Sequence, residues 1–434
     1  MFGELTGKFN INEAWENDVF AKFEVGLGVA ATGLAYDSTK NDGGTRDKSG
    51  LSSGSGINTN YIGYYGGYSG NGEDGYKDAR LIMVHNAYVD MQTNALQTGR
   101  LESYFDLKLG RYESSMDYFS GFTQGVNFDW HFQYGNTDAR PDNEVKLWWF
   151  SSFGRAFAYS QWFYDYYSVK AVNGVDVGIH ALGADVTYGG VADDENGFAY
   201  GDKIFARPFF YFAPGLYEAP GLKLVYDYQF GNGMGVNVTA QGYVLHVHKA
   251  FTTTDKNSNL ARYNEAVDEW SQNINLIAQG NIYNYNVRVG YYENFGSAGS
   301  HFGTYGNPMG IDFWTGSVYD IGASISDIIN RNARSGYLSG GGYYDLRYGT
   351  LSWDLLGRIT RSPRSNEESI ALYVNHDFKN GLVVGLKIEW FRDTTHAGYT
   401  IGSEINRNNN NNKALSSSIT NDRSHAFFTV DYNF

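Results

Sequence analysis

The chain has 434 residues, a formal net charge of -14 and no cysteine. The lack of cysteine excludes disulfides, thiolate metal sites and cysteine nucleophiles, and the acidic balance argues against nucleic acid as the main partner. No segment approaches the run of roughly 18 apolar residues that a membrane-spanning helix needs, so a helical membrane protein is excluded as well.

Apolar residues recur at every second position along most of the chain, a pattern typical of half-buried strands rather than helices. Near the carboxy end, for example, Leu386, Ile388 and Trp390 alternate with Lys387 and Glu389. The alternation predicts strands near 4–11, 19–36, 58–67, 80–93, 101–110, 124–133, 143–150, 173–188, 202–212, 221–230, 234–247, 270–282, 284–293, 334–347, 350–361, 367–378, 382–393 and 424–434.

The connections between these strands alternate in length. Tight turns are predicted near 231–234, 283–284, 348–350 and 379–381, and long polar stretches at 248–269, 294–333 and 395–422. Short periplasmic turns and long extracellular loops are the pattern of a transmembrane antiparallel β-barrel, and the 17% aromatic content suits its two aromatic girdles. We therefore predict an all-β fold, with residues 1–434 forming a single outer-membrane barrel.

The predicted strand count is about 18, an even number as expected of such barrels. The segment 58–67 fits this scheme less well than the others. The connections 37–57 and 189–201 are long but would lie on the periplasmic side, where long connections are unusual. A count of 16 therefore stays open.

The chain ends in strict alternation, with Phe428, Val430, Tyr432 and Phe434 on one face. Chain ends usually fray, so a regular strand up to the last residue needs a partner. We expect the last strand to close the barrel against the first, leaving no unpaired edge.

Two segments resemble known outer-membrane proteins. The segment "AYVDMQTNALQTGRLESYFDLKLGRYESSMDYFSGFTQGVNF" resembles the middle of bacterial porins, where a strand ending in a Leu-x-Leu-Gly-Arg-like run precedes the loop that folds into the pore. The segment "IFARPFFYFAPGLYEAPGLKLVYDYQF" resembles the Helicobacter Hof outer-membrane family, which is itself similar to substrate-specific porins. The resemblance implies an outer-membrane channel. The terminal Phe434 with Tyr432 also resembles the signal that the barrel-assembly machinery reads.

A barrel of this size leaves an aqueous lumen, and the strand phase indicates which side chains face it. The basic residues assigned to the lumen are Lys108, Lys146, Lys223, Arg288, Arg347, Arg358 and Lys387, and the acidic residues are Glu102, Asp106, Glu144, Asp227, Asp345, Asp354, Glu389 and Asp431. For any single residue, the best explanation is that it neutralises an opposite charge next to it on a water-exposed wall. As a set, they predict a charged pore lining that orients polar solutes.

The stretch 112–126, which follows the predicted fifth strand, is the candidate constriction loop. Folded inward, it would bring the acids Glu113 and Asp117 and the ring of Tyr118 to the narrowest point, opposite part of the basic set. The alternative interpretation is an ordinary outside loop.

The sequence "HVHK" places His246 and His248 two residues apart on one strand face. Two such histidines can share a metal ion, but no third ligand can be identified from the sequence. They are therefore interpreted as girdle or rim residues, and neither metal nor cofactor is predicted. No nucleophile motif is found, and no enzymatic activity is predicted.

The function predicted from these patterns is passive diffusion of small hydrophilic solutes or ions, with weak cation selectivity. The expected partners are outer-membrane lipid and lipopolysaccharide, the barrel-assembly machinery and small polar solutes, and the protein is expected to be a monomer or a trimer. The alternative is an adhesin that uses the long loops for surface interactions.

Overall fold

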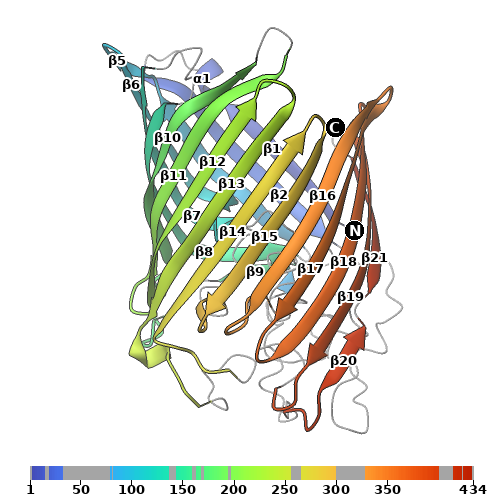
Figure 1. The fold of residues 1–434 in the computed structure, drawn as a ribbon. Helices are drawn as coiled ribbons and strands as arrows, with labels where there is room; N and C mark the ends of the chain where they lie inside the picture. Colours follow the sequence, from blue (N-terminus) through green and yellow to red (C-terminus); the bar gives the residue numbers. More distant parts are fainter. Residues whose placement is uncertain are drawn as a thin grey trace.

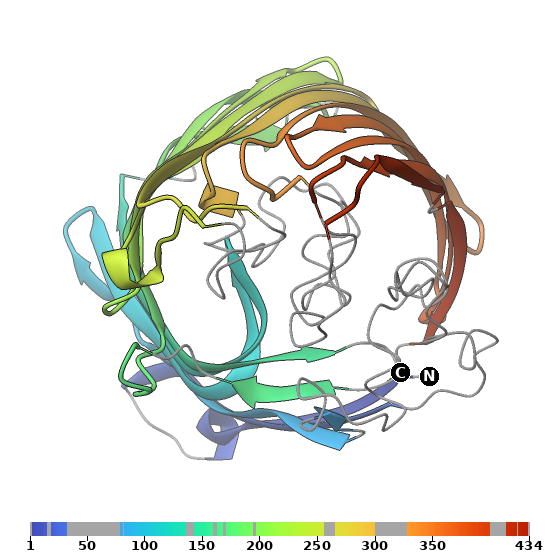
Figure 2. The ribbon, with the colours of Figure 1, turned by 90° about the horizontal axis from the view of Figure 1, so that it is seen from below.

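The computed structural model describes residues 2–14, 19–32, 79–80, 82–135, 143–158, 163–167, 171–193, 197–255, 265–299, 328–399, 414–422 and 424–432. These residues form one antiparallel sheet of 21 strands that curls into a barrel (Figures 1 and 2). Among the described residues, no helix is long and apolar enough to cross a membrane.

The first half of the sheet contains β1 (Phe2–Asn10), β2 (Phe20–Thr32), β3 (Ala79–Arg80), β4 (Ile82–Thr93), β5 (Leu96–Thr98), β6 (Leu101–Met116), β7 (Phe119–Tyr134), β8 (Glu144–Ala158), β9 (Phe163–Tyr167), β10 (Ile179–Asp193) and β11 (Ala199–Ala213). A single helical turn, α1 (Ile11–Ala14), follows β1.

The second half contains β12 (Tyr217–Phe230), β13 (Met234–Val247), β14 (Trp270–Ile282), β15 (Tyr285–Phe295), β16 (Arg334–Leu346), β17 (Gly349–Arg361), β18 (Ser365–Phe378), β19 (Leu382–Thr395), β20 (Ile419–Asp422) and β21 (His425–Tyr432). A 3-10 turn, η1 (Lys249–Phe251), follows β13. Successive long strands pair with each other around the wall, from β1 with β2 to β19 with β21.

The strand alternation places apolar side chains outward and polar side chains inward. On β12 the outward row is 39 to 51% exposed in the protein alone and consists of Leu222, Leu224, Tyr226, Tyr228 and Phe230. The intervening Lys223 and Asp227 are half-buried and face inward. An apolar outer face and a polar inner face are what a barrel in a bilayer requires.

Two short strands, β5 and β20, prolong the long strands β4 and β21 along the same neighbours. Two other short strands, β3 and β9, pair with each other. Leaving these four out of the 21 strands, the described wall has 17 long strands. Each corresponds to one of the 18 predicted strands. The remaining one, 58–67, lies outside the described residues. The described strands on either side of it in the sequence, β2 and β4, pair directly with each other.

This direct pairing corrects the predicted placement of one connection. The chain leaves β2 at Thr32 and enters β4 at Ile82, next to the pair Ala31–Ile82. That end of the barrel also carries the connections β13–β14, β15–β16 and β19–β20, so the chain leaves β2 and enters β4 at the end with the long connections. Residues 37–57 themselves lie outside the described residues. Among the strands that the structure describes, the strand before the candidate loop, β6, is the fourth long wall strand, whereas the prediction made it the fifth.

β1 and β21 are the two edge strands of the described sheet, and the chain ends lie on the same side of the barrel (Figure 2). Tyr432 pairs with Leu382 of β19, and its side chain is exposed. Phe434 lies outside the described residues. No ladder joins β21 to β1 within the part of the chain that the structure describes, so the closing of the barrel stays a prediction.

Candidate functional site

The hairpin of β6 and β7 leaves the barrel wall at its tip. β6 pairs with β4 only up to Arg111, and β7 pairs with β8 only from Thr123 onward. The residues between them, 112–122, make ladder pairs only within the β6–β7 hairpin, from Tyr112–Thr123 to Met116–Phe119. This tip is most of the predicted constriction segment 112–126, and it curves into the interior of the barrel (Figure 2).

A pair of glycines lies where the tip leaves the wall. Gly110 of β6 pairs with Gly125 of β7, and the register of β7 against β8 shifts at this point. Gly110 has a φ of 122°, which L side chains rarely adopt, and a Cβ on Gly125 would collide with the carbonyl oxygen of Ser151. Glycines and a bulge at this position allow the hairpin to bend away from the sheet.

The carboxylate of Asp117 anchors the tip to the inner wall. Its Oδ2 lies 2.8 Å from Nη1 of Arg207 on β11 and 3.0 Å from Nζ of Lys223 on β12. The hydroxyl of Tyr211 donates a hydrogen bond to the main-chain carbonyl of Asp117. Since β8 and β10 lie between β7 and β11 in the wall, the tip reaches these partners only across the inner face of β8 and β10.

Aromatic packing fixes Tyr118, the second residue of the turn between β6 and β7. Tyr118 has a φ of 61°, in the left-handed region that non-glycine residues occupy at a cost of about 1 kcal/mol or more. Its ring is buried and lies 5.7 Å from that of Phe209 and 5.3 Å from that of Tyr243. Burial also raises the pKa of Tyr118 well above its ordinary value, so the side chain stays neutral and packs as a large apolar group.

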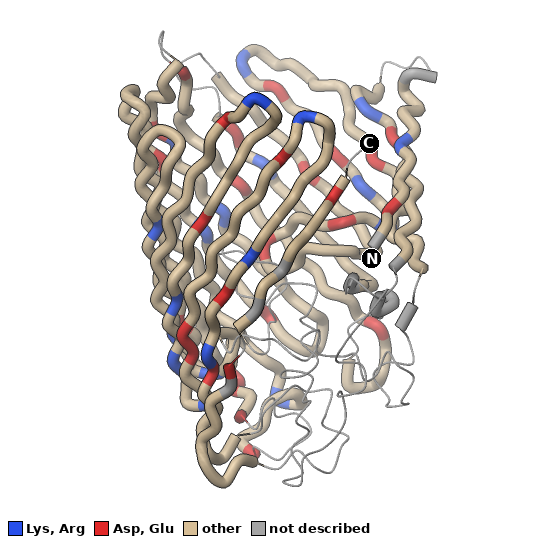
Figure 3. Tube along the Cα trace, turned by 90° about the vertical axis from the view of Figure 1, so that its right-hand side faces the viewer, with Lys and Arg blue, Asp and Glu red and all other residues tan. Residues whose placement is uncertain are grey.

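The anchor belongs to a longer row of alternating charges. Arg207 also contacts both carboxylate oxygens of Asp185 at 2.7 Å, and Asp185 lies 3.1 Å from Nζ of Lys146. The order Lys223, Asp117, Arg207, Asp185, Lys146 therefore alternates in sign across four wall strands and the tip. Bidentate contacts of this kind fix geometry as well as charge. Figure 3 shows acidic and basic positions interspersed along the wall strands.

Arg207 and Asp185 were missed in the sequence, although both lie at the inward phase of predicted strands. Arg207 comes just before Pro208 and the aromatic run 209–212, which draws attention to packing, and Asp185 lies among small and apolar neighbours. The alternation of side chains along a strand was the available signal, because it places both side chains on the face that points into the lumen.

Three further predicted residues, Lys108, Asp106 and Glu144, lie in a neighbouring group on β4, β6, β7 and β8. Nζ of Lys108 lies 3.7 Å from Asp90 and 4.2 Å from the centre of the Tyr88 ring. Asp106 lies 3.1 Å from Nε2 of His131, which also contacts Glu144. Glu113 is on the tip and exposed. The structure thus brings Asp117 and Lys223 together and leaves Glu113 outside that contact.

The other predicted lining residues are distributed from β15 to β19. Arg288 donates a hydrogen bond to Gln279 at 3.0 Å, and Lys387 lies 2.9 Å from Glu389. Arg358 lies 2.6 Å from Glu367, and both side chains are buried. Arg347 differs from the prediction: β16 ends at 346 and β17 begins at 349, which places Arg347, exposed, in the turn and not on the wall.

Replacing Glu367 by Gln is expected to destabilise the barrel by about 3 kcal/mol, because a buried Arg358 loses its charged partner. The matched control is Glu368→Gln: this neighbour faces outward and contacts Arg361 at 2.8 Å, with both side chains well exposed, so its loss costs about 1 kcal/mol or less. Urea unfolding in lipid vesicles measures both values. Equal midpoints for the two variants would contradict the expectation.

The comparisons with known proteins agree with this architecture. A family described as "Putative outer membrane protein" matches residues 1–434. The chain belongs to this family. No curated protein sequence matches it. The prediction of a bacterial outer-membrane protein is confirmed, and the wall strands described above are its membrane-spanning segments.

Solved structures of porins share the fold of this outer-membrane protein. OccAB3 of Acinetobacter baumannii is 13% identical, with a TM-score of 0.53, over 100% of this chain and 92% of that chain. OccAB2 of the same organism is 11% identical, with a TM-score of 0.54, over 95% of this chain and 89% of that chain. At these identities the likeness establishes a porin-type barrel, which confirms the predicted fold class.

Proposed function

We propose that this outer-membrane protein is a passive diffusion channel for small hydrophilic solutes or ions, and that the β6–β7 tip is its constriction. The observation that carries the proposal is the position of Asp117, which lies inside the barrel between Arg207 and Lys223. An ordinary outside loop would not contact inward-facing residues of β11 and β12.

The charge row gives the proposed constriction its chemistry. Arg207, Lys223 and Lys146 lie beside Asp117 and Asp185 on the inner surface, so cations and anions each meet groups of opposite sign. Such a lining favours polar solutes over apolar ones and interacts with charged groups at close range. The exposed Glu113 adds a carboxylate on the tip, which supports a weak preference for cations.

The test of this function is conductance across a planar bilayer under a salt gradient. We expect the wild-type protein to conduct with a slight cation preference, and the Glu113→Gln, Asp117→Asn double variant to shift the reversal potential toward anions. A unit charge acts with about 1 kcal/mol at 4 Å in water, a factor of about five in ion preference, and the shift should grow at low salt.

The control variant is Glu368→Gln, which removes an outward-facing carboxylate and should leave the reversal potential unchanged. A reconstituted wild type that conducts nothing would overturn the channel proposal and favour the surface-interaction barrel instead. Conduction with the same reversal potential in the double variant and the wild type would remove the two acids from the ion path.

A further inference from the structure

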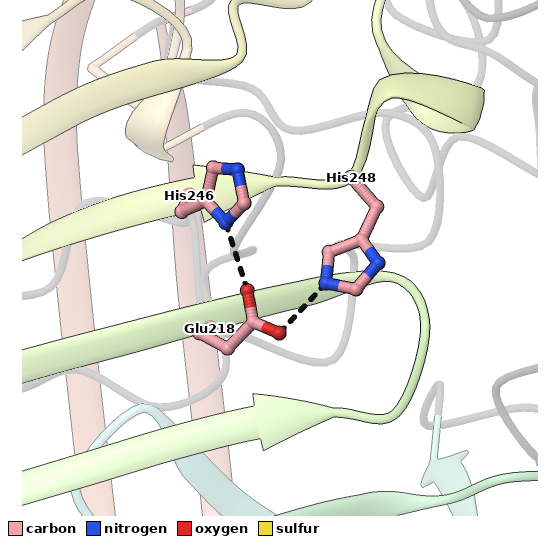
Figure 4. A group of neighbouring side chains, drawn as sticks. All are labelled: Glu218, His246 and His248. Carbon is pink, nitrogen blue, oxygen red and sulfur yellow. Dashed lines mark hydrogen bonds and ion pairs between the residues drawn. The ribbon is translucent and has the colours of Figure 1, made fainter.

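A second cluster of polar side chains lies near the start of β12, outside the charge row. Glu218 near the start of β12 pairs with His246 near the end of β13, and His248 follows directly after β13. All three lie at the end of the barrel that carries the long connections, which faces the outside in such barrels. Their side chains converge (Figure 4).

The cluster faces away from the lumen. Glu218 shares the phase of the outward-facing Leu222 on β12, and His246 shares that of the outward-facing Val244 on β13. The side chains are each about one third exposed: Glu218 by 35%, His246 by 32% and His248 by 35%. An ion could therefore reach them from the outer rim without passing through the pore.

The geometry joins two imidazoles through one carboxylate. Nδ1 of His246 lies 3.0 Å from Oε2 of Glu218, and Nε2 of His248 lies 2.6 Å from Oε1. One candidate ligand atom from each residue lies within 4.8 Å of the other two. Three ligands bound to Zn²⁺ at 2.0–2.1 Å in tetrahedral geometry are about 3.4 Å apart, so modest side-chain rotations suffice to surround an ion.

Neighbouring groups hold the two histidines in place. Nε2 of His246 lies 3.9 Å from the carboxylate of Glu269, and the Trp270 ring stacks on the imidazole with centroids 4.3 Å apart. The main-chain amide of His248 donates a hydrogen bond to the carbonyl of Leu216 at 2.8 Å. A carboxylate beside the second nitrogen of a histidine is the usual support of a metal ligand.

We propose that Glu218, His246 and His248 bind a divalent transition-metal ion of the zinc class at the outer rim of the barrel. Two imidazole nitrogens select such ions over Ca²⁺ and Mg²⁺, which prefer oxygen ligands. Three protein ligands leave a fourth position for water or an exogenous ligand. Glu269 is a positioning residue that orients His246.

Sequence reasoning stopped at the two histidines because the third ligand lies far from them along the chain. Glu218 precedes His246 by 28 positions and reaches it only through the pairing of β12 with β13. The proposal is independent of the channel function, since the cluster lies on the outward face and the conductance experiment does not depend on it.

The test is a Zn²⁺ titration of the full chain, purified in detergent without a histidine tag, by calorimetry at pH 7.5. We expect one Zn²⁺ per chain for the wild type. His246→Gln, His248→Gln and Glu218→Gln should each weaken binding at least about tenfold, and Glu269→Gln about tenfold. The matched control is His396→Gln, since this histidine also lies at the outer end but belongs to no such cluster among the described residues.

A spectroscopic measurement on the wild type keeps the proposal testable if a variant fails to fold. Cu²⁺ bound at this site should show hyperfine coupling to two imidazole nitrogens in electron paramagnetic resonance. Absence of stoichiometric Zn²⁺ binding, equal loss in His396→Gln, or a Cu²⁺ spectrum without nitrogen coupling would each overturn the proposal. The three side chains would then be a hydrogen-bonded rim cluster only.

Discussion

Deleting Tyr432–Phe434 is expected to prevent the protein from accumulating in the outer membrane. β21 is the last wall strand, and its pairing with β19 begins at Leu382 and Tyr432. The deletion removes that pair and the outward-facing aromatic ring of Tyr432. In a bilayer, each backbone group left without a partner costs several kcal/mol, because no water is present to replace it.

The measurement is the level of folded protein at the cell surface, read from heat-modifiable migration on gels. A length-matched control is deletion of Asn409–Asn411 from the asparagine run 408–412, which shortens the chain equally far from its end. Phe434→Ala alone is expected to have a milder effect, since the strand keeps its backbone. Normal surface levels of the truncated chain would show that the terminal residues are dispensable for assembly.

The barrel could be predicted from the sequence because one physical rule applies along its whole length. A wall between lipid and water requires alternation, so residues such as Leu386 and Lys387 reveal both the strand and its two faces. The rule fails where the wall ends. Arg347 was placed on the wall because the alternation was extended past Leu346, where the turn begins.

The contacts of the tip were less predictable for a different reason. The alternation shows that Lys223 and Arg207 face the lumen, but it does not show which side chain a bent hairpin brings to them. That depends on the Gly110–Gly125 pair, on the bulge beside it and on the distance the tip spans inside the barrel. The Asp117–Lys223 contact agrees with the sequence expectation of acids facing basic residues, whereas the Arg207–Asp185 contact required the structure.

Shortening the β6–β7 tip is expected to raise single-channel conductance and to move selectivity toward anions. The register suggests a design that keeps the wall intact. Tyr112 and Thr123 form a cross-strand pair, so replacing residues 113–122 by Asn-Gly joins them through a two-residue hairpin turn. Every ladder of β6 with β4 and of β7 with β8 is retained.

The increase follows from the volume that the tip occupies inside the barrel. Tyr118 and Phe119 pack against the inner wall, and their removal uncovers the rings of Phe209 and Tyr243. Selectivity changes because the variant removes Glu113 and Asp117 from the lumen. Arg207 and Lys223 remain there and lose their contact with the Asp117 carboxylate.

A second variant distinguishes the effect of loosening the tip from the effect of removing it. Arg207→Gln keeps every residue of the tip but removes its 2.8 Å contact to Asp117, leaving Lys223 as the charged anchor. We expect this variant to retain the wild-type conductance level with more frequent fluctuations, whereas the Asn-Gly variant should open permanently to a larger level. If the shortened hairpin assembles into the barrel and changes neither conductance nor reversal potential, the tip is not the constriction.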